Sequence, residues 1–306
     1  MNCVIVGGGG FIGSHLSEAL MNLENNVTVF DRPGAEHLEL LSKKGATIAL
    51  GNFLDSSDLE KALSGVDTVF HLVSTTVPKS SIDDPVFDVT SNLVGTISLL
   101  NVAKNLGVKK IVFASSGGTV YGIPRVIPIT EDHPTNPISS YGIIKLAIEK
   151  YLALFWKLYG LDYCILRVSN AYGERQAANG VQGIIPTMIN KALNHQEIGI
   201  WGDGSVIRDY IHVGDIVTAF LNAAFHEGEP KVFNIGSGVG HSVNDIVKTL
   251  EGLLEESLDL IYEPGRAYDV PVNILDNSLA RQVLHWEPRI PLSDGIRQTL
   301  EYMRKD

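Results

Sequence analysis

The sequence predicts an α/β protein with a doubly wound parallel sheet and a smaller α/β domain toward its C-terminus. Three observations predict this fold. Short apolar runs alternate with helical patterns through the first half of the chain. A run of glycines joins the first apolar run to the first helical pattern. The regular alternation ends near residue 168, so we expect domains over 1–167 and 168–306, with some segments interleaved.

The elements of the first half alternate between strand and helix. Short apolar runs are typical of buried strands, and longer segments with apolar residues three and four apart are typical of helices. We expect strands at 3–6, 27–30, 46–50, 68–73, 110–114 and 162–167. We expect helices at 14–23, 56–63, 85–106 and 141–159. Strands joined in this way form a parallel sheet that is covered on both faces.

The second half of the chain is less regular. It predicts a strand at 197–201 and helices at 184–193, at about 215–224, and from near 278 and 292. No stretch rich in Pro, Gly or Ser separates the two halves. The halves should therefore pack tightly, and we expect the functional site in the crevice between them.

Composition argues against several function classes. The net charge is −11 and there is no basic run, so neither nucleic acid nor a membrane surface is an expected partner. No apolar run reaches the ~20 residues that span a bilayer. The chain opens directly on a strand, which predicts a cytoplasmic protein. Cys3 and Cys164 lie in apolar runs and should be buried thiols, and the histidines lack metal-ligand spacing, so we expect no metal.

The glycine run after the first strand has the spacing of a dinucleotide-binding turn. Gly7, Gly10 and Gly13 form G-x-x-G-x-x-G between a strand and a helix. Glycines there let the backbone approach a pyrophosphate at the helix N-terminus, where Phe11 and Ile12 stand. The pattern predicts a Rossmann-type cofactor site, and the alternative is a glycine-rich turn without a ligand.

Residues after the next strands complete the predicted cofactor site. Asp31 ends the second strand, where an acid can bind the adenosine ribose hydroxyls and repel a 2′-phosphate. This favours NAD over NADP, although Arg32 favours the opposite choice. Asn52 and Phe53 follow the third strand, where an adenine ring can rest, and Leu72 in the fourth strand is counted with them.

A tyrosine and a lysine one helical turn apart are the candidate catalytic pair. Tyr141 and Lys145 lie on one face of the helix expected at 141–159. A free tyrosine has a pKa of ~10, and a neighbouring ammonium group favours its phenolate. Tyr141 is therefore a candidate base, provided that a hydride acceptor is close. The spacing alone favours two ordinary surface residues of an amphipathic helix, and the other motifs decide for catalysis.

Two arginines of the second half are candidates for binding an anionic ligand. The guanidinium groups of Arg208 and Arg266 match phosphate oxygens bidentately. Each arginine also has an acid nearby, Asp209 or Asp269, with which it can form a purely structural pair.

Together these motifs resemble the extended short-chain dehydrogenase/reductase superfamily, and within it the nucleotide-sugar epimerases of the UDP-galactose 4-epimerase type. The resemblance covers nearly the whole chain. Its motifs are Gly7-x-x-Gly10-x-x-Gly13, residues 113–116 with 120–122, Tyr141-x-x-x-Lys145, 167–173, 208–213 and Arg266-x-x-Asp269. The resemblance implies an NAD-dependent enzyme that acts on a UDP- or dTDP-hexose.

The resemblance also implies roles for single residues. Tyr141 would be the base, and Lys145 would bind the nicotinamide ribose and lower the pKa of the tyrosine. Asn92 would lie near the cofactor. The residues matched to positions that hold the sugar diphosphate and its nucleoside are Asn170, Arg208, Arg266 and Asp269.

One position departs from the family pattern. The catalytic Ser/Thr of the family falls on Gly117 here, so Ser116 is the expected catalytic hydroxyl and Thr119 the alternative, both in contact with substrate. Family dehydratases need an Asp-Glu pair where this chain has Gly118 and Thr119. Neither residue exchanges a proton near pH 7, which disfavours dehydration.

The expected reaction is inversion at C4 of a UDP-hexose, UDP-glucose or UDP-galactose, through a 4-keto intermediate. Asn273 stands where family members use bulk to limit the sugar pocket, so N-acetylated hexoses are also expected to fit. The alternatives are a nucleotide-sugar 4-ketoreductase, dehydratase or decarboxylase, or a sensor that binds NAD without turnover.

Two long helices carry more apolar residues than one face of a sheet should cover. A four-helix contact between two copies would bury the surplus, so we expect a homodimer. The alternative is contact with loops of the same chain. The residues expected at the contact are Val94, Ile97, Leu100, Leu152, Phe155 and Trp156.

Overall fold

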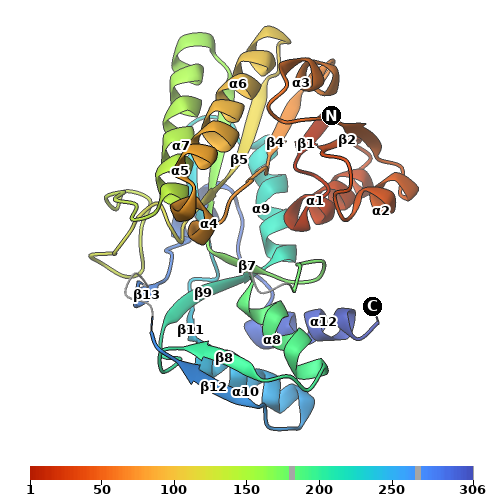
Figure 1. The fold of residues 1–306 in the computed structure, drawn as a ribbon. Helices are drawn as coiled ribbons and strands as arrows, with labels where there is room; N and C mark the ends of the chain where they lie inside the picture. The colour runs from red at the N-terminus through yellow and green to blue at the C-terminus, as the bar shows by residue number, and fades with distance from the viewer. Residues whose placement is uncertain (179–182, 266–269, 306) are drawn as a thin grey trace.

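The computed structural model describes residues 1–178, 183–265 and 270–305. Its centre is a parallel seven-stranded sheet with the order β10-β6-β5-β4-β1-β2-β3 (Figure 1). The predicted doubly wound fold is confirmed. The strands are β1 Asn2–Val6, β2 Asn26–Asp31, β3 Thr47–Leu50, β4 Thr68–His71, β5 Lys110–Ser116, β6 Asp162–Val168 and β10 Val232–Ile235.

Helices cover both faces of this sheet because both faces of its strands are apolar. In β1, Cys3 and Ile5 join one buried cluster, whereas Val4 and Val6 join another on the opposite face. The helices over the first cluster are α1 Phe11–Asn22, α2 Leu38–Lys43 and α9 Val213–Phe225. Those over the second are α3 Ser56–Leu63, α6 Gly95–Asn105 and α7 Ser140–Tyr159.

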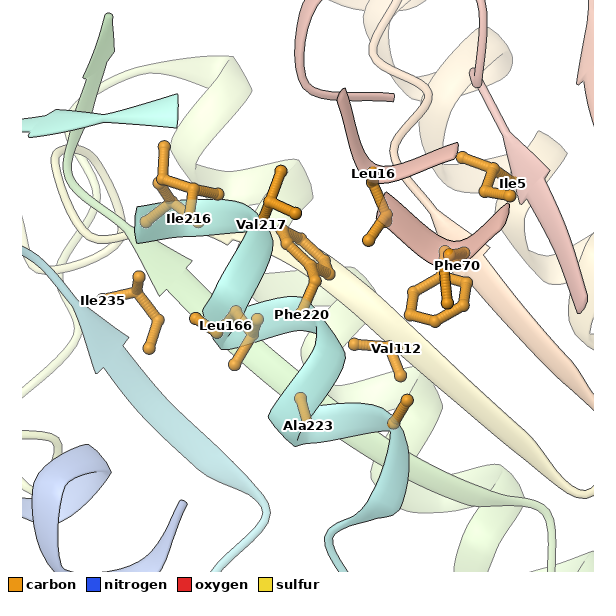
Figure 2. Packing of buried hydrophobic residues seen from close by; sticks show 14 of the residues in the cluster. Ile5, Leu16, Phe70, Val112, Leu166, Ile216, Val217, Phe220, Ala223 and Ile235 are labelled. Atoms are coloured by element: carbon orange, nitrogen blue, oxygen red, sulfur yellow. The ribbon is translucent and has the colours of Figure 1, made fainter. Parts of the chain in front are cut away.

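Helix α9 comes from the second half of the chain but packs against the first sheet. Its residues Ile216, Val217 and Phe220 lie over Val112 of β5 and Leu166 of β6 (Figure 2). Strand β10, which follows α9, pairs with β6 at the edge of the sheet. Helix α11 (Ser278–Val283) packs on β10 and joins the same buried cluster. The second half therefore supplies one strand and two covering helices of the first sheet.

The remaining elements form a smaller α/β layer beyond the carboxyl ends of the strands of the first sheet (Figure 1). Strand β9 is central in it and pairs with β7, β11 and β13, while β8 pairs with β12. These strands are β7 Asn170–Tyr172, β8 Ile198–Trp201, β9 Ile207–His212, β11 Gly240–Ser242, β12 Leu260–Glu263 and β13 Val272–Asn273. The helices are α8 Ile184–Leu193, α10 Val243–Leu254 and α12 Leu292–Met303.

The segment expected as one helix at 85–106 is built from three parts. After a separate helix α4 (Pro78–Asp83) come α5 (Pro85–Asp88), a π-helix η1 (Val89–Val94) and α6. Among the described residues, the run 85–105 is long and apolar enough by composition to cross a membrane. Half of its apolar window is buried inside the protein, where α6 packs on α3 and α7.

Candidate functional site

The turn between β1 and α1 has room for a ligand's phosphates because it lacks side chains. Gly7 has a φ of +88°, which favours glycine, and a Cβ on Gly13 would lie 2.4 Å from the Gly7 carbonyl oxygen. Gly10 is the N-cap of α1, and no side chain caps this helix end. The first amides of α1 are therefore not capped by a side chain, and binding of a pyrophosphate by Phe11 and Ile12 stays a prediction.

Asp31 lies at this turn. Its Oδ2 accepts a hydrogen bond from the Gly9 amide at 2.9 Å, and its Oδ1 accepts one from the Arg32 amide at 2.8 Å. The carboxylate thus joins the end of β2 to the glycine turn, and each oxygen keeps a lone pair for a ribose hydroxyl. The Arg32 residue is exposed to solvent.

The other predicted adenine-side residues differ in their placement. Phe53 is only 9% exposed, and its ring stacks on the buried His71 with the ring centroids 5.4 Å apart. Its ring is therefore largely a core side chain, and its contact with adenine stays a prediction. Asn52 is exposed, although its Oδ1 accepts from the Leu54 amide at 3.0 Å. Leu72 donates its amide to the Val6 carbonyl at 2.9 Å and continues the sheet.

The candidate catalytic pair lies in the first turns of α7. Ser139 caps this helix, and the Tyr141 amide donates to Ser81 Oγ at 3.0 Å. Lys145 is buried, and its Nζ donates to the Ala114 carbonyl of β5 at 2.9 Å. The same Nζ lies 5.5 Å from the centroid of the Tyr141 ring. The structure therefore brings the tyrosine and the lysine together, as their spacing predicted.

The pKa values of this pair differ from the expectation. Burial raises the pKa of Tyr141 to about 12, while a hydrogen bond with the Ser74 side chain acts in the opposite direction. Burial also lowers the pKa of Lys145 to about 8. The carboxylates of Asp88 and Glu149 raise this pKa, but by less than burial lowers it. In the protein alone the pKa of Tyr141 is therefore raised overall, because desolvation is the larger effect, and the expected lowering by Lys145 stays a prediction. The protein by itself holds the phenol protonated at neutral pH.

The loop after β5 contains the two candidate hydroxyls. Ser116 is the last residue of β5. The Thr119 carbonyl packs against the first turn of α7, since a Cβ on Gly142 would lie 2.8 Å from it. Thr119 Oγ1 is buried and has no hydrogen-bond partner within the described part of the chain. A hydroxyl left in this state is available to a ligand.

The predicted substrate residues come next to this loop. Asn273 Nδ2 donates to the Gly117 carbonyl at 3.3 Å, and Asn273 pairs in register with Arg208 of the neighbouring strand β9. Strand β9 also pairs with β7, which begins at Asn170. Arg208 Nη1 donates to the Ile207 and Val270 carbonyls at 2.9 and 2.5 Å. Arg266 and Asp269 lie outside the described residues.

Asn92 is buried in the π-helix and bonds within the protein. Its Oδ1 accepts from the Thr75 amide at 2.9 Å, and its Nδ2 donates to Asp88 Oδ1 at 2.9 Å. Sequence reasoning missed Asp88, which is completely buried beside the catalytic pair. The only local pattern that pointed to it was an acid four residues before Asn92 on an expected helix.

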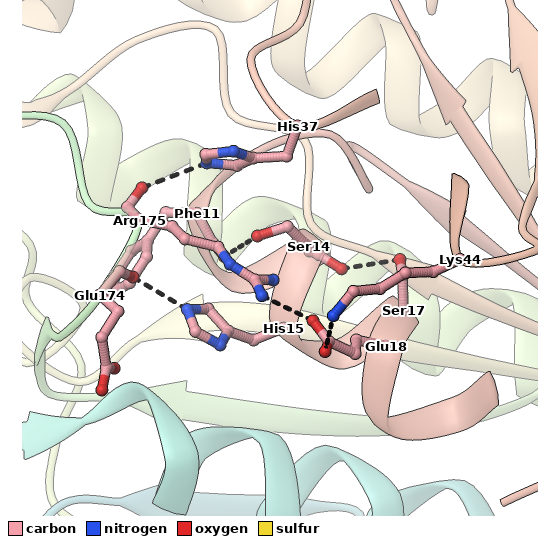
Figure 3. Close-up of polar contacts among 10 residues, drawn as sticks. Phe11, Ser14, His15, Ser17, Glu18, His37, Lys44, Glu174 and Arg175 are labelled. Atoms are coloured by element: carbon pink, nitrogen blue, oxygen red, sulfur yellow. Dashed lines mark hydrogen bonds and ion pairs between the residues drawn. The ribbon is translucent and has the colours of Figure 1, made fainter. Parts of the chain in front are cut away.

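A network of charged residues joins the two halves away from Tyr141 (Figure 3). Arg175 Nη2 bonds Glu18 Oε2 of α1 at 2.6 Å, and His15 Nε2 lies 2.9 Å from the Glu174 carbonyl oxygen. His37 Nε2 lies 3.3 Å from the Arg175 carbonyl oxygen. A pocket of about 380 Å³ adjoins the network and is lined by residues that include His15, Glu174, Arg175, His212, Gln298 and Tyr302. The network fixes the loop after β7 on α1.

Known proteins that are similar to this chain match it over both of its halves. The model of the NAD dependent epimerase/dehydratase family matches residues 3–236. A UDP-glucose 4-epimerase of Mycolicibacterium smegmatis is 36% identical over 310 residues, which cover 99% of each chain. A dTDP-4-dehydro-6-deoxyglucose reductase of Escherichia coli is 33% identical over 308 residues, 98% of this chain and 97% of the reductase.

Solved structures are similar over the whole chain. The UDP-glucose 4-epimerase of Thermotoga maritima with UDP-glucose has a TM-score of 0.95 and 37% identity, covering 100% of this chain and 99% of its own. The UDP-glucose 4-epimerase of Thermus thermophilus in complex with NAD has a TM-score of 0.92 and 31% identity, covering 99% of each chain. A UDP-N-acetylglucosamine 4-epimerase of Methanobrevibacter ruminantium, in complex with UDP-N-acetylmuramic acid, has a TM-score of 0.93 and 32% identity, covering 99% and 98%.

Proposed function

Because the chain belongs to the NAD dependent epimerase/dehydratase family and is an NAD-dependent nucleotide-sugar epimerase, we propose that it inverts C4 of a UDP-hexose through a 4-keto intermediate. One observation carries the choice of reaction. Tyr141 stands in the first turn of α7 close to the loop of Thr119, whose buried hydroxyl has no partner among the described residues. This arrangement offers a proton acceptor and a hydrogen-bond donor to one sugar oxygen.

Each site residue has a role in the proposed reaction. NAD held by the glycine turn and Asp31 would supply the hydride acceptor and donor for C4 of the sugar. Tyr141 Oη accepts the proton of the 4-hydroxyl group and later gives it back. Lys145, fixed by the Ala114 carbonyl, places a positive charge beside the phenol and favours its ionised form. Asp31 and the glycine turn hold the ribose and the pyrophosphate.

The catalytic hydroxyl comes from Ser116 or Thr119, and the structure favours Thr119. Thr119 Oγ1 is buried without a partner in the described residues, whereas a hydroxyl in water would keep its hydrogen bonds. A sugar oxygen at this place would restore the missing bond. Its role is to hydrogen-bond the oxygen on C4 while Tyr141 moves the proton.

We place the diphosphate and nucleoside on the smaller domain. Asn170 and Arg208 lie on the neighbouring strands β7 and β9, and Arg266 and Asp269 belong to the segment before β13. Asn273 is 1% exposed, and its Oδ1 is buried with no hydrogen-bond partner among the described residues. Since this side chain is smaller than tyrosine, the proposed sugar range includes N-acetylated hexoses. Turnover of UDP-glucose with refusal of UDP-N-acetylglucosamine would contradict that part.

A substrate panel tests the reaction. Purified protein is incubated with UDP-glucose, UDP-galactose, UDP-N-acetylglucosamine and dTDP-glucose, without added NAD, and the products are separated. We expect interconversion of the C4 epimers with no net change of absorbance at about 340 nm, because the cofactor is regenerated. Tyr141→Phe is expected to lose nearly all turnover and to retain NAD. No conversion of any sugar by the unaltered protein would refute the proposal.

A 4-ketoreductase is the second candidate, favoured by the 33% identity with the Escherichia coli reductase. Such an enzyme would consume reduced cofactor in proportion to product, so a lasting loss of absorbance with a 4-keto sugar separates it from an epimerase. Dehydration stays disfavoured because Gly118 and Thr119 cannot exchange a proton near pH 7.

We also propose that the chain forms a homodimer through α6 and α7. Three of the residues expected at that contact, Leu100, Leu152 and Phe155, lie in the core of the same chain. The exposed apolar residues of the π-helix before α6 and of α7 include Val94, Ile143, Leu154, Trp156 and Leu158. They offer apolar surface that a second copy can cover.

A further inference from the structure

Asp88 is a completely buried carboxylate whose contacts are all neutral donors. It ends helix α5 and has no exposed surface. Its Oδ1 accepts from Thr76 Oγ1 at 2.6 Å and from Asn92 Nδ2 at 2.9 Å. Its Oδ2 accepts from Ser140 Oγ at 2.7 Å. A buried charge is costly unless it is fully hydrogen-bonded, so each of these contacts matters for Asp88.

The three donors come from three different segments of the candidate site. Thr76 lies in the loop after β4, Asn92 lies in the π-helix, and Ser140 is the residue before Tyr141 in α7. The π-helix starts at the residue after Asp88, and such turns occur frequently at functional sites. One carboxylate therefore joins the catalytic helix to the two segments beside it.

The charge of Asp88 also acts on both members of the catalytic pair. It raises the pKa of Tyr141 and that of Lys145, in each case as a smaller effect than burial. The other charged or titratable groups that face Lys145 are Glu149, one turn further along α7, and His71 of β4.

We propose that Asp88 is a positioning residue of the hydride-transfer site, which holds the first turn of α7 so that Tyr141 and Lys145 keep their places. This inference rests on the proposed function. Asp88 contacts Ser140 and Asn92 rather than the reacting groups. Its effect on the reaction is therefore exerted through α7 and through its charge.

Two substitutions separate the contacts of Asp88 from its charge. Asp88→Asn can keep all three contacts, because its Oδ1 still accepts from Thr76 and Asn92 and its Nδ2 can donate to the Ser140 hydroxyl. This variant removes only the charge. Asp88→Ala removes the contacts and the charge together, and leaves three buried donors without their acceptor.

The two variants should differ in kinetics. Asp88→Ala is expected to lower kcat by about 10- to 100-fold with KM changed little, because misplaced catalytic groups cost rate rather than binding. Asp88→Asn should keep kcat within about tenfold while the acidic limb of its pH profile moves to lower pH. The direction follows from Asp88 raising the pKa of Tyr141, so that loss of the negative charge lets the phenol ionise more easily.

A second measurement needs no turnover. The Cζ carbon of Tyr141 is followed by NMR against pH in protein labelled with 13C-tyrosine and loaded with NAD, and Tyr141→Phe assigns the signal. The midpoint in Asp88→Asn is expected about half a pH unit or more below that of the unaltered protein.

Asp215→Asn is the matched control. Asp215 is also buried, 4% exposed, and accepts from the amides of Arg289 and Ile290 at 3.0 Å each. It lies in the first turn of α9, which covers the face of the sheet opposite to α7. It should lose stability without a change in the pH profile or in the Tyr141 midpoint. A similar profile change in Asp215→Asn would overturn the assignment, since it would reflect a general effect of destabilisation.

The outcomes separate this inference from the proposed function. A folded Asp88→Ala with unchanged kcat, or an unchanged Tyr141 midpoint in Asp88→Asn, overturns the role of Asp88. If Asp88→Ala fails to fold, the Asp88→Asn midpoint decides. If the unaltered protein converts no UDP-hexose, the proposed function fails, while the NMR midpoint still tests the electrostatic part.

Discussion

Gly117 lacks a side chain because Leu275 occupies the space that one would need. A Cβ at this position would lie 2.4 Å from Leu275 Cδ1, and Leu275 is completely buried. A packed interior gives such a leucine little freedom to move. We therefore propose that Ser116 or Thr119 supplies the hydroxyl that the family pattern places at this position.

Two single substitutions decide between these hydroxyls. Thr119→Val keeps the shape of the side chain and removes only the hydroxyl, so we expect kcat to fall by about 100-fold with stability unchanged or slightly raised. Ser116→Ala is expected to lower kcat by less than about tenfold. Both variants are measured with the best UDP-hexose of the panel. The reverse order of effects would assign the role to Ser116.

Lys145 makes stability depend on pH. Its pKa falls from 10.5 in the unfolded chain to about 8 in the folded protein because of burial. Between those values the unfolded chain binds more protons, so the stability of the unaltered protein rises with pH from about 8 to 10.5. Lys145→Met should be more stable by about 1–3 kcal/mol at pH 7, and this advantage should shrink above pH 8. Urea unfolding at pH 7, 8.5 and 10 measures it, and a pH-independent difference contradicts the assignment.

The sequence allowed the catalytic pair to be predicted, but not its electrostatics. Spacing alone put Tyr141 and Lys145 on one face of a helix. Whether the phenol is ionised depends on burial, which comes from the packing of α7 on Ala114 and the loop of Ser74. These segments are distant in sequence, so the direction of the pKa shift required the structure.

Among the elements, α7 is held to the sheet by a buried ion pair. Arg167 of β6 contacts Glu149 of α7 through Nη2 at 2.7 Å and through Nε at 3.0 Å. Ser115 of β5 donates to the same carboxylate at 2.5 Å, and Arg167 Nη1 donates to Tyr121 Oη at 2.9 Å. This cluster lies one turn beyond Lys145 and ties α7 to strands β5 and β6.

Breaking the pair from one side should be costly. Glu149→Ala leaves the buried Arg167 charge unpaired, and we expect a loss of about 3–5 kcal/mol in the free energy of unfolding. The double variant Glu149→Leu with Arg167→Leu should lose less, because no charge remains buried. Lys43→Ala, which breaks the exposed pair with Glu39, serves as control and should leave the urea midpoint unchanged. A double variant less stable than Glu149→Ala would contradict this account.

Element boundaries were predictable where the periodicity was strong. The helices at 56–63 and 184–193 match α3 and α8 residue for residue. The π-helix at 89–94 was not predictable, because one wider turn leaves the apolar spacing almost unchanged. Nor did the sequence place Phe53 in the core, since its neighbours there, His71 and Gly95, come from other elements.

For the whole molecule, the exposed apolar residues of η1 and α7 are the basis of the proposed homodimer. Leu154 is 44% exposed and Leu158 is 58% exposed, one turn apart on α7. Leu154→Glu with Leu158→Glu should convert the dimer to a monomer in sedimentation at micromolar concentration, because burying two carboxylates is costly. Leu23→Glu changes an equally exposed leucine, 57%, at the end of α1 and should leave the dimer intact. A monomeric unaltered protein would reject the dimer outright.

Local sequence patterns did not predict that the second half supplies elements to the first sheet. The sequence predicted the helix at 215–224, but nothing in it indicated that α9 covers the first sheet. Residues 232–235 gave no sign that they pair with β6 rather than with the smaller sheets. Such pairings depend on contacts between residues far apart in the chain, and only the folded structure reveals them.

Strand β10 is synthesised after all the other strands of the first sheet, and this order affects folding during synthesis. While a ribosome is still extending the chain past β6, the outer backbone groups of that strand have no neighbour, and the apolar patch later covered by α9 faces water. Strand β6 can gain its outer neighbour, β10, only once residue 235 has left the exit tunnel. Until then the nascent chain exposes an unpaired strand edge and an apolar patch. Chaperones bind such surfaces, and aggregation can start from them.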